Sequence, residues 1–455
     1  MLVPSLWVDE ELIMQDSILT AWTLADREDF NWEPMKKNND QNPVLRSDLD
    51  LSPVRGEDGG TMILLRDPFG LDCNGPLAFS EGALPLLSLL DGNNNAQDIL
   101  DLLEQKMADA ENQARIPLEA IQSFIDSLDE AFLLDNNRFA KARKALVDSF
   151  KQRPDRPAAL AGASYPEDPD ACRNFIDQLL DSGNGESDTD NLQEKDIVAL
   201  VAPHIELRVG DKVYSAAYNT LRGRSYDRVI VLGVGHNMSS GLFSLTGKDF
   251  VTTLGTVPAD QFAVKRLRQA AGQLASTDDF EHRSEHSIEF QVVLLQSVLE
   301  SPFTLVPVLC GSLFEQLVLG DLARPNEFEE LVPALDCLAS MLTEKGSRTL
   351  LVAGVDLCHI GPKFGDRNPA IQIARDSKAH DRALLDHLTA QDVESFVAES
   401  RYVRDRYHVC GFSALSMLLE ILPEGITGRE LGYHLWHETP TQSAVSFAAA
   451  AFYRE

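Results

Sequence analysis

Short apolar runs alternate with amphipathic runs in the last two thirds of the chain. The apolar runs are rich in β-branched residues and nearly continuous in hydrophobics, which is typical of strands that are covered on both faces. They predict strands at 197–203, 228–234, 303–310 and 349–355. Two late runs, at 430–438 and 443–453, are expected to return as strands across a T-P-T-Q turn. Helical spacing of the apolar residues predicts helices at 214–222, 260–274, 327–342 and 373–388. Such alternation predicts a parallel or mixed sheet with helices on both sides.

The front of the chain shows a different pattern. Residues 61–150 contain a strand-like run, three amphipathic stretches, and a segment at 131–140 that is typical of two short strands across an Asn-Asn turn. A strand, three helices and a hairpin predict a small, mainly α winged-helix domain, although a generic helical bundle fits the same pattern. Residues 1–60 mix short apolar and polar stretches, so we expect an N-terminal extension there. We expect the α/β domain to cover residues 156–455.

The net charge of the chain limits which classes of molecule it can bind. The chain has 455 residues, with 40 lysines and arginines against 71 aspartates and glutamates, a formal charge of −31. A polyanion would be repelled, so we expect no nucleic-acid partner. The first residues are acidic where a signal peptide is basic, and no apolar run reaches the ~18 residues of a membrane span. We therefore expect a cytoplasmic protein without a membrane partner.

The six cysteines lie far apart, and no two of them form a C-x-x-C pair. In a chain of this size that is expected to be cytosolic, this spacing argues against a disulfide framework. Each cysteine is therefore considered singly.

Three of the ten histidines directly follow predicted strands. They are His204, His236 and His359, and the carboxyl ends of strands are where open α/β sheets build their sites. A single histidine in such a place is more often structural, but three at equivalent strand ends favour a shared site. Imidazole suits zinc, copper and iron, so the sequence predicts a metal ion of one of these kinds.

A metal site of this kind needs a further ligand. Cys410 precedes a glycine and a helix-like run, and its thiolate would complete a set of two histidines and one cysteine. An inert buried thiol, or a nucleophile with His359 as its base, fits the same residue. Asp356 lies three residues before His359, so it is a candidate to orient that imidazole, which would then act as a general acid or base.

A polar run ahead of a predicted helix supplies further candidates. Glu285, His286 and Glu289 would face a pocket from the start of this helix, although a solvated helix start explains them as well. The GVGHNM segment lacks the third small residue of a dinucleotide-binding loop, and no G-x-S-x-G or P-loop motif is present. NAD, serine-hydrolase and ATPase functions therefore have no support.

Eight segments, in order, resemble the MEMO family, also called AmmeMemoRadiSam system protein B. They are PAALAGASYP, VAPHIELRVG, VLGVGHN, EHSIEF, TLVPVLCG, GVDLCHIG, VCG and SAVSFAAAAF. The resemblance spans about residues 156–455. It implies a three-layer α/β/α sandwich like that of class III extradiol dioxygenases. The front domain is similar to PqqD-like winged-helix modules, which bind peptides or partner enzymes by adding a strand at a sheet edge.

The resemblance also implies residue roles and partners. The two histidines and the cysteine of the family's metal pocket fall on His204, His236 and Cys410. Asp356 and His359 line that pocket, with His286 nearby, and these three are the expected catalytic residues. The family's system implies a radical S-adenosylmethionine protein and an AMME-type domain protein as partners.

Two departures from the family pattern concern the expected substrate pocket. Asn237 stands where many relatives have a second histidine, and Ile205-Glu206-Leu207 replaces a common A-G-Y. We expect Glu206, Asn237, Glu285 and Glu289 to contribute to substrate preference. A cysteine in place of the carboxylate of extradiol dioxygenases favours copper or zinc over iron.

Two functions fit these residues. The first is a metal-dependent, dioxygenase-like oxidoreductase that acts on a small or peptide-linked substrate. The second is a non-catalytic metal-binding interaction protein. A hydrolase with a Cys-His pair is a minor alternative.

Overall fold

The computed structural model describes residues 42–55, 60–71, 75–107, 116–183, 192, 194–238 and 240–454. The chain divides between Asp148 and Ser149 into two compact units. Each unit has its own hydrophobic core, so each is described by itself.

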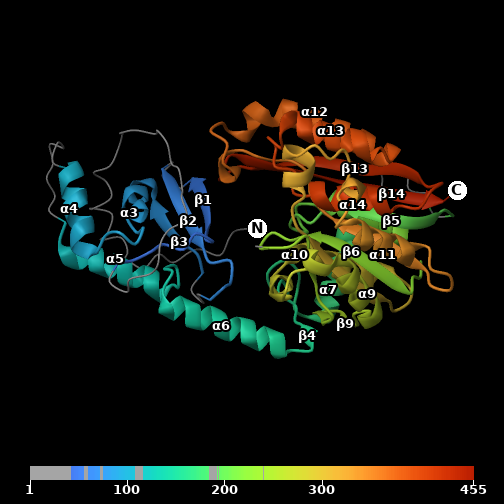
Figure 1. Ribbon diagram of the computed structural model, residues 1–455, viewed down its shortest axis with the longest axis horizontal. Helices are drawn as coiled ribbons and strands as arrows, with labels where there is room; N and C mark the ends of the chain where they lie inside the picture. Colours follow the sequence, from blue (N-terminus) through green and yellow to red (C-terminus); the bar gives the residue numbers. More distant parts are fainter. Residues whose placement is uncertain are drawn as a thin grey trace. The chain divides into compact units, whose positions relative to one another are not determined.

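The first unit combines a three-stranded antiparallel sheet with helices (Figure 1). Its strands are β1 (Asp50–Arg55), β2 (Thr61–Arg66) and β3 (Leu77–Ser80), in the order β1-β2-β3. Its helices are α3 (Leu84–Ser88), α4 (Ala96–Met107), α5 (Leu118–Glu130) and most of α6 (Asn137–Gln152). β2 confirms the predicted strand at the start of this unit. The sheet begins earlier than expected, because β1 pairs with β2 along its whole length.

The hairpin predicted at 131–140 is wrong. Leu134 makes an isolated bridge with Leu45, and the chain then enters α6 directly. The Oδ1 atom of Asn136 accepts hydrogen bonds from the backbone amides of Arg138 and Phe139, at 2.9 and 3.0 Å. Asparagine in this position caps a helix, so the residue that suggested a turn starts α6 instead.

The second unit is built on a mixed sheet with the order β12-β14-β5-β11-β6-β10-β7, with β13 paired to β14. Its inner strands β5, β11, β6 and β10 are parallel, and β14 and β7 are antiparallel to their neighbours. The strands are β5 (Asp196–Ala202), β6 (Arg228–Val234), β7 (Phe243–Leu245), β10 (Thr304–Cys310), β11 (Thr349–Gly354), β12 (His359–Ile360), β13 (Thr427–Glu438) and β14 (Ser443–Arg454). All six strands predicted in this part of the chain are confirmed.

A small second sheet lies beside it, in the order β4-β8-β9. Its strands are β4 (Asp155–Arg156), β8 (Asp249–Thr252) and β9 (Gly255–Val257).

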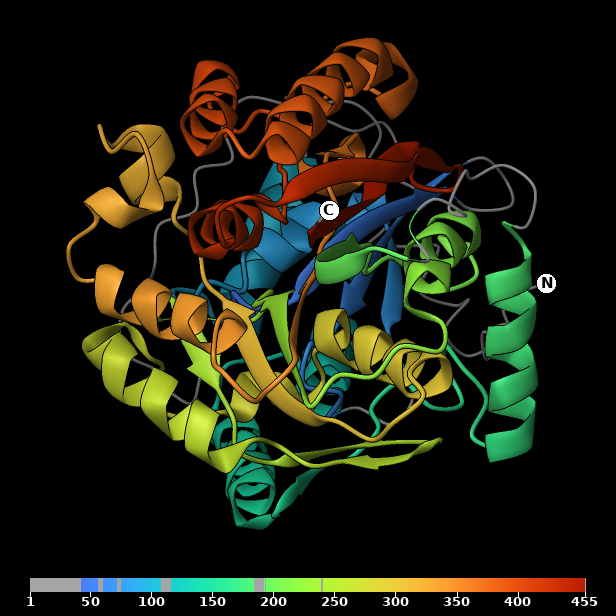
Figure 2. The same cartoon turned by 90° about the vertical axis from the view of Figure 1, so that its right-hand side faces the viewer.

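Helices cover both faces of the mixed sheet (Figure 2). Alternate residues of β5 show this, because Ala199 and Val201 belong to one core cluster and Leu200 and Ala202 to the other. One cluster includes α9 (Gln261–Ala271), α11 (Val332–Leu342), α12 (Ala370–Ala390), α13 (Val393–Val403) and α14 (Phe412–Ile421), and the other includes α7 (Pro169–Asp181), α8 (Asp211–Tyr218) and α10 (His286–Val298). The α/β fold predicted from the alternation of elements is confirmed. No helix in the described ranges is both long and apolar enough for a transmembrane segment.

Two glycines let α10 approach the sheet closely. A Cβ atom added at Gly233, near the end of β6, would collide with the Ser287 hydroxyl, and one at Gly354, the last residue of β11, would collide with the Ser287 carbonyl. Because neither strand carries a side chain there, the first turn of α10 sits directly against two strand ends.

Five cysteines lie within the described residues, and all five are free thiols. They are Cys172, Cys310, Cys337, Cys358 and Cys410. Cys73 lies outside the described residues. The absence of a disulfide among the described cysteines agrees with the separate treatment that their spacing suggested.

Candidate metal centre

The site begins at the carboxyl ends of three neighbouring strands. His204 follows β5, His236 follows β6, and Asp356 follows β11, which lies between those two strands. Because parallel strands end at the same edge of a sheet, residues far apart in the sequence meet there. Cys410 reaches this edge from another direction, on the turn that leads into α14.

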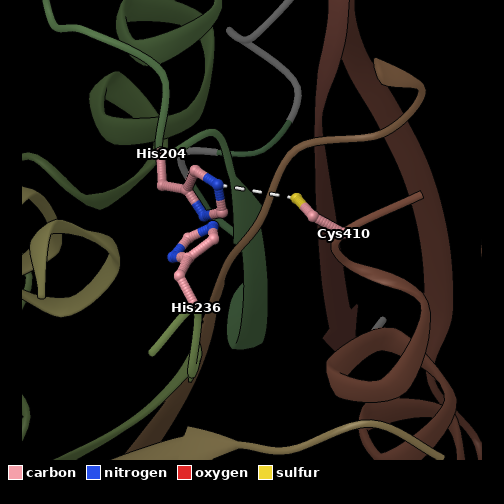
Figure 3. A group of neighbouring side chains, drawn as sticks. All are labelled: His204, His236 and Cys410. Carbon is pink, nitrogen blue, oxygen red and sulfur yellow. Dashed lines mark hydrogen bonds between the residues drawn. The ribbon is translucent and has the colours of Figure 1, made fainter. Parts of the chain in front are cut away.

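The side chains of His204, His236 and Cys410 converge (Figure 3). Their nearest potential ligand atoms all lie within 4.8 Å of one another, and Cys410 Sγ is 3.5 Å from His204 Nε2. In a tetrahedral site with metal–nitrogen bonds of about 2.0 Å and metal–sulfur bonds of about 2.3 Å, neighbouring donors are roughly 3.3–3.6 Å apart. The three donors therefore fit a single ion after small side-chain movements.

The second ring nitrogen of each histidine supports this role. The Nδ1 atom of His204 donates to the carbonyl of Gly354 at 3.0 Å, and Nδ1 of His236 donates to Glu285 at 3.1 Å. With the proton on Nδ1, the Nε2 atom of each ring keeps its lone pair. Imidazoles that bind metals are held in the same way, with one nitrogen on a carbonyl or carboxylate and the other on the ion.

Glu285 organises two imidazoles at once. It caps α10, where its side chain accepts the backbone amide of Ser287 at 3.0 Å, and its carboxylate lies 3.1 Å from Nδ1 of both His236 and His286. The rings of these two histidines stack with centroids 4.9 Å apart. Burial alone would raise the pKa of Glu285, but the two imidazoles outweigh it and hold the pKa well below its usual range.

A second donor set overlaps the first. Potential ligand atoms of His236, Glu285 and His286 also lie within 4.8 Å of one another. In this arrangement Glu285 already accepts bonds from both rings and from a backbone amide. We therefore treat Glu285 as the group that orients the histidines and not as a primary ligand.

Asp356 holds a different group from the one we expected. Its Oδ1 atom accepts the backbone amides of His204 at 2.9 Å and Ile205 at 3.3 Å, and its Oδ2 atom lies 3.6 Å from His204 Nε2. His359 uses its Nδ1 atom on the carbonyl of Leu357 at 3.0 Å. Within the described part of the chain, Asp356 therefore binds the turn that carries His204, while the His359 ring is held by a backbone carbonyl.

The protonation states follow from burial. Burial, followed by repulsion from His286 and His236, lowers the pKa of His204 well below its ordinary value. Burial and the charge of Asp356 raise the pKa of the Cys410 thiol well above its ordinary value. Without a cation the imidazole is neutral and the thiol keeps its proton, which disfavours a cysteine nucleophile. A bound cation reverses this preference, because a coordinated thiol is deprotonated.

A cavity of about 500 Å³ adjoins the site. His236, His359 and Cys410 are among its lining residues, together with the rings of Phe314, Phe364 and Phe412 and the side chain of Cys310. Burial lowers the pKa of His359 to about 4, so this imidazole is neutral near pH 7. Small-molecule sites are typically cavities of about 300–1,000 Å³ with mostly apolar walls and a few polar groups.

The remaining pocket candidates lie in three different environments. Asn237 is exposed beside His236, and Glu206 is partly exposed, with Arg208 3.6 Å away. Glu289 is fully buried and forms an ion pair with Arg156, so its carboxylate is already occupied by protein groups. His282, from the same polar run, is buried with Nε2 3.0 Å from the carbonyl of Ser244, a structural contact.

Sequence reasoning missed several groups at this edge. The Gly354 carbonyl that orients His204 carries no sequence signal, because every residue has a carbonyl. Cys310 lines the cavity at the end of an apolar strand, where such a residue is usually core, and Phe364 lies in a polar turn that carries no sign of a site. The signal that could have identified the bridging role of Glu285 is its position directly before a helix, where an acidic side chain caps the first turn.

Comparison with known proteins agrees with the resemblance found in the sequence. The family model described as "Memo-like protein" matches residues 156–451. A "MEMO1 family protein" of Aquifex aeolicus is 29% identical over 407 residues, which cover 89% of this chain and 98% of the relative. Relatives of the same description from Thermus thermophilus and Methanosarcina mazei are 27% and 24% identical and cover 72% and 58% of this chain, and 92% and 85% of their own lengths.

The Aquifex match leaves only 11% of this chain uncovered, which is fewer residues than the first unit contains, so that relative shares part of this unit too. The family model covers well over half of the chain, and all of the matched range falls in the second unit. The chain belongs to the Memo-like protein family.

Proposed function

We propose that this protein is a metal-dependent oxidoreductase of the dioxygenase-like kind, acting on a small or peptide-linked substrate in the cavity beside His236. One observation carries the proposal. Three donors from different segments converge, and two of them, His236 and Cys410, line a cavity that the neutral imidazole of His359 also lines. A purely structural metal site would be closed by a fourth protein ligand.

In this proposal His204, His236 and Cys410 hold iron, copper or zinc. When bound, such an ion supplies Lewis-acid or redox chemistry to substrate oxygens. The thiolate favours copper or zinc, because soft sulfur ligands prefer these metals. Glu285 and the Gly354 carbonyl keep both imidazoles in the tautomer that ligation requires.

His359 is the proposed proton acceptor. Its Nδ1 atom is committed to the Leu357 carbonyl, and its ring packs edge-on against Phe364 with centroids 4.9 Å apart. The neutral ring therefore presents Nε2 as the atom that takes a proton from a substrate hydroxyl. Asp356, buried nearby, stabilises the imidazolium that results by its charge. His286 is proposed as a second polar group beside His236.

Two finer structural proposals accompany this function. The sheet with helices on both faces supports a three-layer α/β/α sandwich of the class III extradiol dioxygenase type. The three-stranded sheet and helices of the first unit support a PqqD-like winged-helix module that binds a peptide or partner enzyme. A radical S-adenosylmethionine protein and an AMME-type domain protein are the proposed partners, and co-purification with each, with and without the first unit, tests them.

Metal analysis tests the site itself. Protein purified without chelators is expected to contain close to one equivalent of metal, and His204→Ala and Cys410→Ser are expected to remove most of it. Asn237→Ala serves as a matched control, because Asn237 is an exposed neighbour of His236 outside the donor set. Equal metal content in all four proteins contradicts the proposal.

A non-catalytic metal-binding interaction protein is the second candidate. One observation favours it, namely a thiol among the donors where extradiol dioxygenases use a carboxylate. The two functions separate at His359, which is not in the donor set. If His359→Ala retains metal and partner binding and no turnover is detected in the wild type with phenolic or peptide-linked substrates, the interaction role is favoured.

A further inference from the structure

A buried arginine contacts the backbone of Glu285, the residue whose carboxylate bonds His236 at the candidate metal site. Arg156 is 0% exposed, and its Nε and Nη2 atoms donate to the carbonyls of His282 at 2.8 Å and Glu285 at 2.9 Å. Its guanidinium pairs with the carboxylate of Glu289, which is also 0% exposed. Arg156 therefore binds the backbone of Glu285, just before α10, and the side chain of the same Glu285 orients His236.

The carboxylate of Glu289, which pairs with Arg156, also accepts hydrogen bonds from other protein groups. Glu289 accepts the backbone amides of Ala159 and Leu160, both at 3.0 Å, and the hydroxyl of Tyr165 at 2.6 Å. These fixed donors hold the carboxylate, and the carboxylate holds the guanidinium. Because planar guanidinium donors have fixed directions, the positions of the two carbonyl groups are determined as well.

A buried ion pair is weak evidence for a role in stability. Replacing such a pair by apolar groups of similar volume is often neutral or stabilising, so the geometry that a buried pair imposes on its neighbours is the property to consider. In this site the geometry in question is that of Glu285, through its backbone carbonyl and its side-chain carboxylate. The carbonyl of Glu285 contacts Arg156, and its carboxylate lies 3.1 Å from the Nδ1 atoms of His236 and His286.

We propose that Arg156 is a positioning residue for the metal centre, which fixes the backbone of Glu285 so that its carboxylate orients His236 and His286. The inference rests on the proposed metal-binding function. Arg156 contacts no proposed ligand, so it acts only through Glu285.

The test uses the full chain, stripped with a chelator and titrated with Zn²⁺ and Co²⁺. Arg156→Lys keeps the charge that pairs with Glu289 but loses the forked contacts to the two carbonyls. We expect its metal affinity to fall by about tenfold, the lower end of the loss seen when outer-sphere partners are removed. We also expect a changed thiolate-to-cobalt charge-transfer band, which a merely structural role would not alter.

Tyr165→Phe is the matched control, because it removes a hydrogen bond to the same Glu289 without touching the Glu285 carbonyl. It is expected to leave both the affinity and the cobalt spectrum unchanged. If circular dichroism shows that Arg156→Lys is unfolded, Glu289→Gln replaces it, because it keeps the shape of the partner and removes the charge that fixes the guanidinium. A smaller loss of affinity in the same direction is then expected.

Wild-type affinity and spectrum in folded Arg156→Lys, or in Glu289→Gln where that variant replaces it, overturn this inference while leaving the metal site intact. An equal loss in Tyr165→Phe also overturns it, since the effect would then be general to the network. If the wild-type protein binds neither Zn²⁺ nor Co²⁺, the proposed function itself fails.

Discussion

Glu285 and Glu289 lie one helical turn apart at the start of α10, and both are buried, at 4% and 0% exposure. Glu285 faces two imidazoles beside a cavity, whereas Glu289 faces a guanidinium, two backbone amides and a tyrosine hydroxyl. The partners distinguish the two residues, since residue type, burial and helix position are nearly the same. A buried carboxylate next to titratable groups can adjust to a ligand, while one held by fixed donors serves the fold.

The largest expected effect is a loss of folding stability when Glu289, the carboxylate held by fixed donors, is removed. Glu289→Ala leaves the guanidinium of Arg156 buried without its charge partner, which typically costs about 3–5 kcal/mol of stability. Urea denaturation followed by circular dichroism measures the loss for the second unit. A loss below about 1 kcal/mol would mean that water or another group replaces the carboxylate, and Glu289 would then not be structural.

The next largest effect is a loss of metal affinity when the charge of Glu285 is removed. Glu285→Gln keeps the size of the side chain but removes the charge between His236 and His286, so we expect zinc affinity to fall by about 10–100-fold. The free energy of unfolding is expected to change by less than Glu289→Ala changes it. Chelator competition gives the affinity and urea denaturation the stability. Wild-type affinity in this variant would remove the distinction between the two glutamates.

A pH titration tests the protonation states that this site requires. The pKa of the Cys410 thiol is raised, so the metal-free protein holds that proton near neutral pH and must release it when a metal binds. The pKa of His204 is lowered, so that imidazole is already neutral and releases none. Affinity is therefore expected to rise by about tenfold per pH unit between about pH 6.5 and 8.5. The slope is expected to flatten in Cys410→Ser, and a steep slope there would show that another group supplies the proton.

The smallest effect extends the comparison to a third carboxylate. Glu206 is partly exposed, and its closest cationic partner is Arg208 at 3.6 Å. Exposed ion pairs contribute about 0–1 kcal/mol, so Glu206→Gln is expected to leave stability within about 0.5 kcal/mol and zinc affinity unchanged. Parallel measurements with Glu285→Gln provide the check. A drop in affinity comparable to that of Glu285→Gln would place Glu206 in the site.

Much of the fold was predictable because local patterns carry it. The continuous hydrophobic runs identified β5, β6, β10 and β11, since strands covered on both faces have no polar side. The segment 131–140 was assigned wrongly because asparagine favours turns and helix caps alike. Leu134 forms its bridge with Leu45. Leu45 precedes the three strands of this unit and Leu134 follows them, so no short-range pattern could indicate that pairing.

The site was predictable in part for a related reason. His204 and His236 follow strands that are neighbours of β11, so a position at a strand end was enough to bring them together. Glu289 was grouped with Glu285 because the two are four residues apart, on the same side of a helix. Its actual partner, Arg156, lies 133 residues earlier in the chain.

Local periodicity in the sequence determined which segments are strands or helices and which histidines stand at strand ends, because those features depend on neighbouring residues alone. Tertiary structure decided the rest. Cys410 and His204 are 206 positions apart, and their 3.5 Å approach exists because the turn before α14 folds against the sheet edge where β5 and β11 end. The partners of Glu285, Glu289 and Asp356 were decided the same way, since the folded chain places groups from distant segments beside each carboxylate.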